Sequence, residues 1–301
     1  MSASGVALGK FVTRNKKAYV QWGYVATVGG LIMLVTAAAQ FRRTNYELFL
    51  GIHIVLAVFW IAGGWLHTAE QDFQEFYYAA TAVWVLDRAV RIARLVAFGV
   101  QKATVEIKAD EILKVTVPRP KYWKPFPGCH AFIHFLKPTM FWQSHPFTVV
   151  DSVTKENTIT FYIKIKGGVT HGLYQFLSKQ PDHKAQVYAT VEGPYGQPMP
   201  LSRYSTAVLF AGGNGIPGLY ANAVKMAKSS VATKVKLHWV IRHYHSIQWF
   251  YDELKKLEGT NAEVTVYVTK PTEGFISDFN TSDGTDEKQE KGEAESFGHE
   301  D

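Results

Sequence analysis

Two long apolar runs without a charged side chain dominate the first quarter of the sequence. The first covers residues 19–41 and ends before Arg42, and the second covers residues 48–67. As α-helices rising about 1.5 Å per residue, both are long enough to cross a hydrocarbon core of about 30 Å. The alternative is two buried helices of a soluble core, but uncharged runs of this length are costly to hide in a domain of this size. We therefore predict two membrane-spanning helices.

A third apolar run, residues 76–86, leads directly into a charged segment. Asp87 and Arg88 follow it, and Arg91 and Arg94 continue at intervals of three residues. Side chains three positions apart lie on one face of a helix, so these arginines are predicted to form a basic stripe. We expect a membrane segment of about three helices within residues 1–98.

The distribution of charge predicts how this segment is oriented. Basic residues follow the first and third runs, which places those ends on the cytoplasmic side, and the acidic loop 68–74 then lies outside. Basic residues between positions 14 and 17 oppose this orientation, but everything after residue 98 is patterned as a soluble, cytoplasmic module. A net charge of +6 suits a nucleic acid or a membrane surface. Arginines at the ends of apolar runs favour the membrane, and we predict no nucleic-acid partner. The first 17 residues lack the apolar core and cleavage site of a signal peptide.

Two histidines, His53 and His67, occupy the second run. A separation of 14 residues is close to four helical turns, so both point to the same side, about 21 Å apart along the axis. Histidine inside a membrane usually has a functional partner, and two stacked hemes, each ligated by one histidine, would explain the spacing. An interfacial His67 and a helix-packing His53 explain it equally well. Cys129 is the only cysteine, which excludes an internal disulfide and a cysteine-based zinc or iron–sulfur site in one chain.

After residue 98 the pattern changes to short strands separated by turns rich in Pro, Gly, Asp and Asn. The predicted strands are residues 103–107, 112–117, 131–136, 148–150, 158–165 and 185–191. Such regular spacing is typical of a small β-barrel or sandwich. Gly167 and Gly168 precede a short helix, residues 170–178. Their backbone N–H groups form an anion site at a helix N-terminus, or else the pair is an ordinary left-handed turn.

The last part of the chain alternates strands and helices. Strands are predicted at residues 207–210, 235–241 and 263–268, and helices at 219–228 and 247–257. This order predicts a parallel, doubly wound sheet. The glycine-rich turn 211–218 follows a strand and opens a helix, where a pyrophosphate can approach the backbone. Arg242, not an acidic residue, ends the second strand, which favours NADPH over NADH.

Two motifs near the middle of the chain connect these modules. The run PGCHAFIHF, residues 127–135, and the run FWQSHPFTV, residues 141–149, closely resemble the fungal transmembrane ferric reductases, relatives of the NADPH oxidases. The resemblance extends to about residue 271. It implies partial transmembrane heme-binding helices in residues 1–98 and a β-barrel FAD-binding domain in residues 99–196. It further implies a partial α/β NADPH-binding domain in residues 197–271 and leaves an acidic, disordered tail, residues 272–301.

The resemblance also implies ligand contacts. It assigns FAD to the central motif and the glycine pair, which comprise His145, Pro146, Phe147, Thr148, Val149, Gly167, Gly168 and Thr170. It assigns NADPH to two glycine-containing turns, which comprise Gly193, Pro194, Tyr195, Gly196, Gly212, Gly213, Asn214 and Gly215. His53 would ligate an inner heme b and His67 an outer one. The arginine stripe would meet heme propionates or lipid phosphates.

The implied activity is electron transfer from NADPH through FAD and heme b to an extracellular ferric or cupric chelate, for iron uptake. The implied location is the plasma membrane, with a vacuolar or other internal membrane as the alternative. We expect no acid, base or nucleophile, because the cofactors carry the chemistry. A superoxide-forming NADPH oxidase is an alternative. Family members also have an earlier helix with opposing histidines and a further cysteine-containing strand, so a non-catalytic, shortened membrane protein that pairs with another reductase chain is a second alternative. A soluble flavodoxin-reductase-like enzyme requires ignoring both membrane spans.

Overall fold

The computed structural model describes residues 3–44, 46–138, 143–151, 157–200, 203–228 and 234–271. It contains two compact units, Met1–Ala93 and Arg94–Asp301. The predicted acidic tail, residues 272–301, lies outside the described residues.

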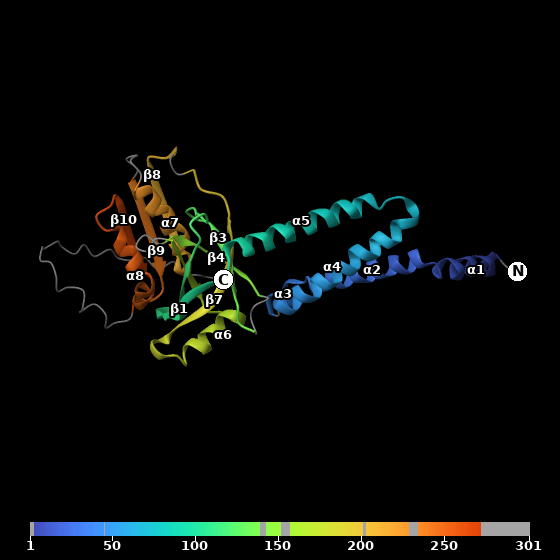
Figure 1. Cartoon of the computed structure of the whole chain (residues 1–301), viewed down its shortest axis with the longest axis horizontal. Helices are drawn as coiled ribbons and strands as arrows, with labels where there is room; N and C mark the ends of the chain where they lie inside the picture. Colours follow the sequence, from blue (N-terminus) through green and yellow to red (C-terminus); the bar gives the residue numbers. More distant parts are fainter. Residues whose placement is uncertain are drawn as a thin grey trace, which may run out of the picture. The chain divides into compact units, whose positions relative to one another are not determined.

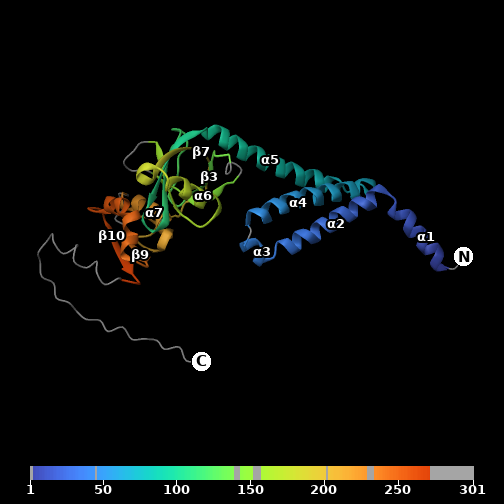
Figure 2. The ribbon, with the colours of Figure 1, turned by 90° about the horizontal axis from the view of Figure 1, so that it is seen from below.

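The first unit is built on two helices that pack side by side, α2 (Ala18–Thr36) and α4 (Tyr46–Thr68) (Figures 1 and 2). Their backbones approach closely because small residues face each other. A Cβ atom on Gly63 would lie 2.9 Å from both the Ala26 nitrogen and the Trp22 carbonyl oxygen. Such close contact is typical of helices that associate in membranes. Both helices are long and apolar enough to cross a membrane, as predicted.

The remaining helices differ from the predictions in part. In the first apolar run, residues 19–41, the helix ends at Thr36. The last residues of that run belong to a separate short helix, α3 (Ala39–Thr44). A further helix, α1 (Ala3–Asn15), was not predicted. The third run does form a helix, α5 (Glu75–Phe98). Among the described residues, however, only α2 and the 48–68 part of α4 combine the length and apolar composition of a span. A third span is not confirmed, because charged residues occupy the second half of α5.

The second unit begins with a curled antiparallel sheet. Its strands are β1 (Gln101–Lys108), β2 (Ile112–Pro118), β3 (His130–Phe135), β4 (His145–Thr148), β5 (Val150–Asp151), β6 (Thr158–Lys164) and β7 (Lys184–Tyr195). The strand order is β4-β3-β7-β1-β2-β6-β5. The two edge strands, β4 and β5, are separated in the chain only by Val149, so the sheet must curl until its edges meet. This closure produces the predicted barrel, although the predicted strand 148–150 is interrupted at Val149.

Alternating apolar side chains fill the interior of the barrel. They include Ala103, Val105, Val115, Val117, Ala131, Ile133, Phe135, Val187, Ala189 and Val191. Helix α6 (Gly168–Leu177) adds Val169, Leu173 and Leu177 to the same core. In β3 every second residue is buried, as expected for a strand with one inward face, whereas all interior residues of β6 are buried.

The second unit ends in a three-stranded parallel sheet of β8 (Thr206–Gly212), β9 (Lys234–Ile241) and β10 (Ala262–Val268). Helix α7 (Ile216–Ala227) connects β8 to β9. The predicted single helix 247–257 is instead three short pieces, η6 (Tyr244–Trp249), α8 (Tyr251–Leu254) and η7 (Lys255–Leu257).

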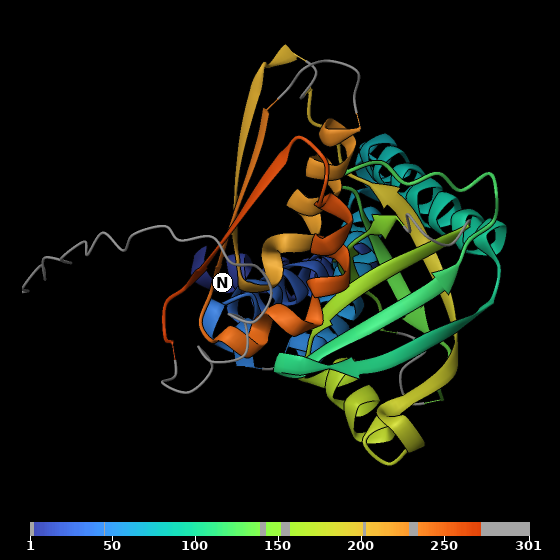
Figure 3. The same ribbon diagram turned by 90° about the vertical axis from the view of Figure 1, so that its left-hand side faces the viewer.

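The predicted parallel sheet is confirmed, but the described strands are not doubly wound. They lie in the order β10-β9-β8, which is chain order without a reversal. In Figure 3, α7 and α8 both lie on the face of the sheet that looks toward the barrel. On the other face, Val208 and Phe210 are 49% and 70% exposed. A doubly wound sheet would cover this face with helices.

Three barrel residues belong to the apolar core of the parallel sheet, which is separate from the barrel interior. Ile112, Val150 and Tyr162 of the barrel belong to the same buried cluster as Tyr220 of α7 and Phe250, which precedes α8. The two modules are therefore packed into one body, and ligand sites between them have defined walls.

Candidate functional site

A cleft of about 670 Å³ opens at the carboxyl ends of the parallel strands. Gly213 and Asn214 follow β8, Arg242 and His243 follow β9, and Thr269 follows β10. The other lining residues come from the end of β9, from η6 and from the barrel: Asp110, Ile112, Lys164, Val240, Ile241, Ser246 and Trp249. In open α/β sheets, ligands bind in the crevice outside these strand ends. The structure thus brings together three residues predicted for NADPH: Gly213, Asn214 and Arg242.

The glycine turn at this cleft is hydrogen-bonded to β9 on one side and has open space on the other. The indole N–H of Trp239, which is fully buried in β9, donates a hydrogen bond of 2.8 Å to the Gly213 carbonyl. Gly213 has φ +47°, a left-handed conformation. A Cβ atom added to Gly212, Gly213 or Gly215 would meet no atom within 4 Å. The backbone is therefore open to a pyrophosphate on the side that a side chain would cover.

The central motif on β4 presents alternate residues to opposite faces of the barrel. Thr148 pairs with His130 and Pro146 with Phe132 across the β3–β4 ladder. Paired residues share a face, and this one points outward, because the intervening Ala131 belongs to the core.

The other motif residues point inward. Phe147 packs against the barrel core, Val149 is 1% exposed, and His145 lies opposite the core residue Ile133. Only Pro146 and Thr148 of the predicted flavin motif therefore face outward, and the remaining members shape the wall behind them.

Three aromatic rings cover the outward face beside Pro146 and Thr148. The Tyr195 ring on β7 lies 5.9 Å from that of His130 and 5.8 Å from that of Phe132. The Arg94 guanidinium lies 4.9 Å from the centre of the Tyr195 ring. Aromatic rings on one face suit a planar ring system such as a flavin, which can stack on them. Sequence reasoning missed His130 and Phe132, although their alternation with Ala131 around the start of the predicted strand 131–136 was a usable signal.

Tyr195 is further constrained by a buried carboxylate. Its hydroxyl donates a hydrogen bond of 2.5 Å to Glu192, which is 2% exposed. Burial and this hydrogen bond raise the pKa of Tyr195. The end of β7 packs closely on β3, since a Cβ atom on Gly193 would lie 3.0 Å from the Ala131 Cβ atom. Gly193, Pro194, Tyr195 and Gly196 lie beside the aromatic face and do not line the strand-end cleft, so their predicted contact with NADPH remains a prediction.

The predicted phosphate turn at α6 is shaped by Thr170. The Thr170 hydroxyl accepts a hydrogen bond from the Lys166 N–H at 3.1 Å and donates one to the Gly167 carbonyl at 2.9 Å. Thr170 is 8% exposed, so it holds the turn from inside. Gly168 adopts φ +52°, and a Cβ atom there would lie 3.8 Å from the Gln143 side-chain oxygen. That oxygen is buried without a hydrogen-bond partner among the described residues. Gln143 is thus a site residue that sequence reasoning quoted but did not assign.

The predicted flavin motif on β4 contacts α7, the helix that follows the glycine turn and is called the nucleotide helix below. A Cβ atom on Gly218 in α7 would lie 3.5 Å from the Thr148 methyl group. Asn222, one turn further along α7, is 2% exposed and donates to the Gly218 carbonyl at 2.9 Å. The first turns of α7 therefore lie directly against β4. The predicted flavin motif and the helix that follows the glycine turn are therefore neighbours in the fold.

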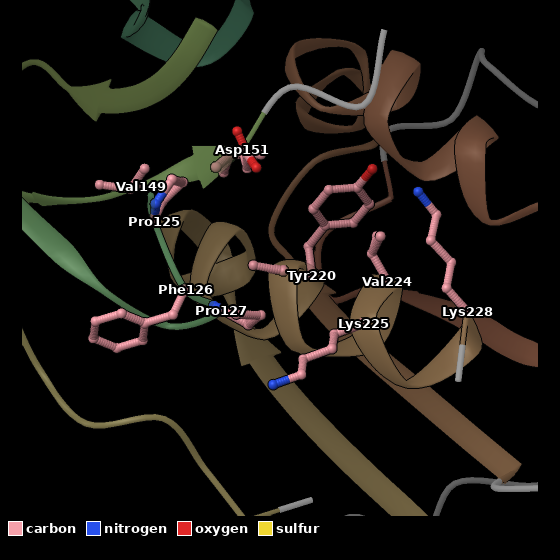
Figure 4. A pocket seen from close by; sticks show the side chains of 11 residues that line it. Pro125, Phe126, Pro127, Val149, Asp151, Tyr220, Val224, Lys225 and Lys228 are labelled. Carbon is pink, nitrogen blue, oxygen red and sulfur yellow. The ribbon is translucent and has the colours of Figure 1, made fainter. Parts of the chain in front are cut away.

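A second cavity, of about 350 Å³, lies between α7 and the barrel. Figure 4 shows Tyr220 and Val224 projecting from one side of α7, Lys228 just after the helix on that same side, and Lys225 on another side. Opposite them is Asp151, whose carboxylate lies 3.4 Å from Arg119. Of the predicted site residues, only Val149 lines this cavity, so we assign it no cofactor.

The two membrane histidines differ in the hydrogen bonding of their Nδ1 atoms. The Nδ1 atom of His67 lies 2.7 Å from the Tyr19 carbonyl oxygen. A carbonyl only accepts, so Nδ1 carries the proton and Nε2 keeps the lone pair that a metal needs. The Nδ1 atom of His53 is buried without a hydrogen-bond partner in the described part of the chain. A buried unpaired polar atom is costly, and a metal ion bound to it would satisfy it. Both residues fit heme ligation.

Three family models match successive parts of the chain. "Ferric reductase like transmembrane component" matches residues 5–64, "FAD-binding domain" matches residues 97–199, and "Ferric reductase NAD binding domain" matches residues 204–298. The second unit therefore contains an FAD-binding and an NAD-binding domain. The boundary between these two domains lies between the end of β7 and the start of β8.

Curated relatives cover nearly the whole chain. It is 47% identical over 293 residues to "Ferric/cupric reductase transmembrane component 1" of Candida albicans, which covers 95% of this chain and 38% of the relative. It is 38% identical over 259 residues to "Ferric reductase transmembrane component 3" of Saccharomyces cerevisiae, which covers 85% and 36%. The chain thus spans less than half the length of these relatives. Among solved structures, a ferredoxin NADP+ reductase from Neisseria gonorrhoeae matches with a TM-score of 0.46 and 16% identity, over 57% of this chain and 69% of that one.

Proposed function

The chain belongs to the fungal ferric reductase family, and on this premise we propose that it is a transmembrane metalloreductase that moves electrons from NADPH through FAD and heme b to an extracellular ferric or cupric chelate. The observation that carries the proposal is the contact between Thr148 of the flavin motif and Gly218 of the nucleotide helix. When bound, FAD accepts a hydride and releases electrons singly, and heme b passes single electrons onward.

The role of the protein is to bind and orient these groups. Asn214 and the glycine turn bind the pyrophosphate of NADPH, and Arg242 contacts the adenosine end of NADPH. Pro146, Thr148 and the aromatic face around Tyr195 support the flavin ring, while the turn held by Thr170 receives its pyrophosphate. His67, with its tautomer set by the Tyr19 carbonyl, and His53 would each hold one heme.

The direction of transfer follows from the charge distribution. Basic residues at the ends of the first and third apolar runs support a cytoplasmic location for the FAD and NADPH modules. The acceptor chelate then lies on the other side, at the plasma membrane. A metal acceptor, and not dioxygen, is favoured by the wording "ferric/cupric reductase" in the names of similar proteins.

An absorption spectrum of the purified full chain in lipid nanodiscs, before and after NADPH, tests this proposal. We expect flavin bleaching followed by the bands of reduced heme, and reoxidation on adding a ferric chelate. Superoxide dismutase should not slow reduction of the chelate. Flavin bleaching without heme bands would contradict the transmembrane path, and loss of chelate reduction with superoxide dismutase would favour the oxidase.

A further inference from the structure

One basic side chain in the strand-end cleft comes from the barrel and not from the nucleotide-binding module. Lys164 ends β6 and lines the cleft together with Arg242 and His243. Its position could not follow from the pattern of either module alone, because it depends on how the two are packed.

Lys164 is held by an acidic turn of the barrel. Asp110 lies between β1 and β2 at φ +61°. Its carboxylate is 3.8 Å from the Lys164 Nζ atom, and the Glu111 carboxylate is 3.5 Å from the same atom. Lys164 also donates to the Asp110 carbonyl.

The same carboxylate reaches the nucleotide-binding module. Asp110 accepts a hydrogen bond of 3.1 Å from the Ser246 hydroxyl and lies 3.9 Å from the His245 Nε2 atom. Both partners belong to η6, the segment that follows Arg242 and His243 at the end of β9. Asp110 therefore places an anionic group among the basic residues at this end of the cleft.

We propose that Lys164 binds the 2′-phosphate of NADPH together with Arg242 and His243, and that Asp110 occupies this position while the nucleotide is absent. The inference rests on the proposed NADPH-dependent function. The dinucleotide pyrophosphate belongs to the glycine turn after β8, whereas the ribose 2′ position is read after the second strand. The contacts of Asp110 with η6 put Lys164 at that second end.

The electrostatics favour an exchange of anions. The Lys164 and Asp110 side chains are each about one-third exposed (34% and 37%), and an ion pair this exposed and this long contributes little to stability. A phosphate monoester carries a charge of about −1.5 to −2 at neutral pH, against −1 for a carboxylate, and offers three acceptor oxygens. The phosphate therefore replaces the Asp110 carboxylate at Lys164 without a large loss elsewhere. NADH, which lacks this phosphate, leaves the pair intact.

Binding of adenosine 2′,5′-bisphosphate and of AMP to the full purified chain tests the proposal. The unmodified chain should bind the bisphosphate more tightly than AMP. Lys164→Gln should weaken bisphosphate binding by about tenfold, as expected for a charge-assisted phosphate contact, and leave AMP binding unchanged. In steady-state assays the same variant should raise the KM for NADPH and not that for NADH. Asp110→Asn should tighten bisphosphate binding.

Lys236→Gln is the matched control, because Lys236 is paired with Glu263 at 3.5 Å on strands β9 and β10 and does not line the cleft. It should bind both probes like the unmodified chain. Equal bisphosphate affinity in Lys164→Gln and the unmodified chain would overturn the proposal, as would an equal loss for AMP, which would assign Lys164 to the 5′-phosphate. Unchanged affinity in Asp110→Asn would overturn the anion exchange. If the unmodified chain shows no preference for the bisphosphate, the NADPH assignment itself fails.

Discussion

The Glu253 carboxylate accepts a hydrogen bond of 3.1 Å from the Tyr162 hydroxyl and so joins the nucleotide-binding module to the barrel. Glu253 lies in α8 and is only 5% exposed, and Tyr162 lies in β6. Tyr220 of α7 donates to the same carboxylate at 3.2 Å, and Lys256 lies 2.6 Å away. A buried carboxylate is tolerated when its lone pairs are satisfied in this way. The cluster therefore fixes the position of α7 and α8 on the barrel.

Removing the Tyr162 hydroxyl should weaken this junction. Tyr162→Phe keeps the ring and deletes one hydrogen bond to a buried charge, so we expect the free energy of unfolding of the second unit to fall by about 1.5–3 kcal/mol. Denaturant unfolding followed by tryptophan fluorescence measures the change. Tyr188→Phe is the matched control, because Tyr188 is 54% exposed and its hydroxyl is not part of the cluster. An equal effect of both variants would contradict the role of the Glu253 cluster.

The same cluster predicts a loss of stability at alkaline pH. Burial, followed by the charge of Glu253, raises the pKa of Tyr162 and of Tyr220 above their ordinary value of 10.0. Above that pH the unfolded chain releases both phenolic protons and the folded chain keeps them. The unfolded state then binds fewer protons, so stability is fully present below pH 10 and falls as the pH rises further. The slope of the free energy of unfolding against pH above pH 10 should therefore become shallower in Tyr162→Phe, by the contribution of one proton. Unfolding at a series of pH values would measure this slope.

The contact between Thr148 and Gly218 should control the rate of flavin reduction. Gly218→Leu inserts a branched side chain where a Cβ atom already reaches van der Waals distance of Thr148, at 3.5 Å. It should push α7 from β4 and slow NADPH-dependent flavin reduction by about 100-fold, since a displacement of about 1 Å has that effect on reacting groups. Stopped-flow bleaching of the flavin measures this rate. Gly218→Ala is the control and should react nearly normally, and a normal rate in Gly218→Leu would exclude this contact from the reaction path.

Local patterns in the sequence were sufficient to predict the features that depend only on residues close together in the chain. The alternation around Ala131 and Ile133 predicts the inward face of β3, and the strand ends predict that Gly213, Asn214 and Arg242 meet. Both follow from the fixed geometry of strands and of parallel sheets. The break of the predicted helix 247–257 could not be seen in this way, because Trp249 and Phe250 are positioned by the core shared with the barrel.

Contacts between modules were the part that periodicity could not predict. Lys164 and Asp110 enter the cleft only because the barrel packs against η6, and Tyr195 lies on the flavin side because β7 pairs with β3. These contacts join residues far apart in the chain, such as Asp110 and Ser246. The third predicted span was not confirmed, for another reason. The run before Asp87 is apolar, but the helix continues through the arginines.

A glycine on α2 should be as important for heme binding as the histidine that it faces. A Cβ atom on Gly23 would lie 2.5 Å from the Nδ1 atom of His67, the atom bonded to the Tyr19 carbonyl. Gly23→Ala therefore displaces the imidazole and breaks the bond that sets its tautomer, although no ligand is changed. We expect heme content, measured from the reduced spectrum of the purified chain, to fall by about tenfold or more, as for loss of a partner that orients a metal ligand.

The matched control for this prediction is Gly51→Ala on α4, where an added Cβ atom meets nothing within 4 Å. It makes the same chemical change in a membrane helix and should retain full heme content. His67→Ala should lose at least as much heme as Gly23→Ala, because it removes the ligand itself. If Gly23→Ala keeps its heme while His67→Ala loses it, the imidazole ligates from a position other than the one that the Tyr19 carbonyl holds. If both keep full heme content, His67 is a helix-packing residue, because its bond to Tyr19 then serves only the contact between α2 and α4.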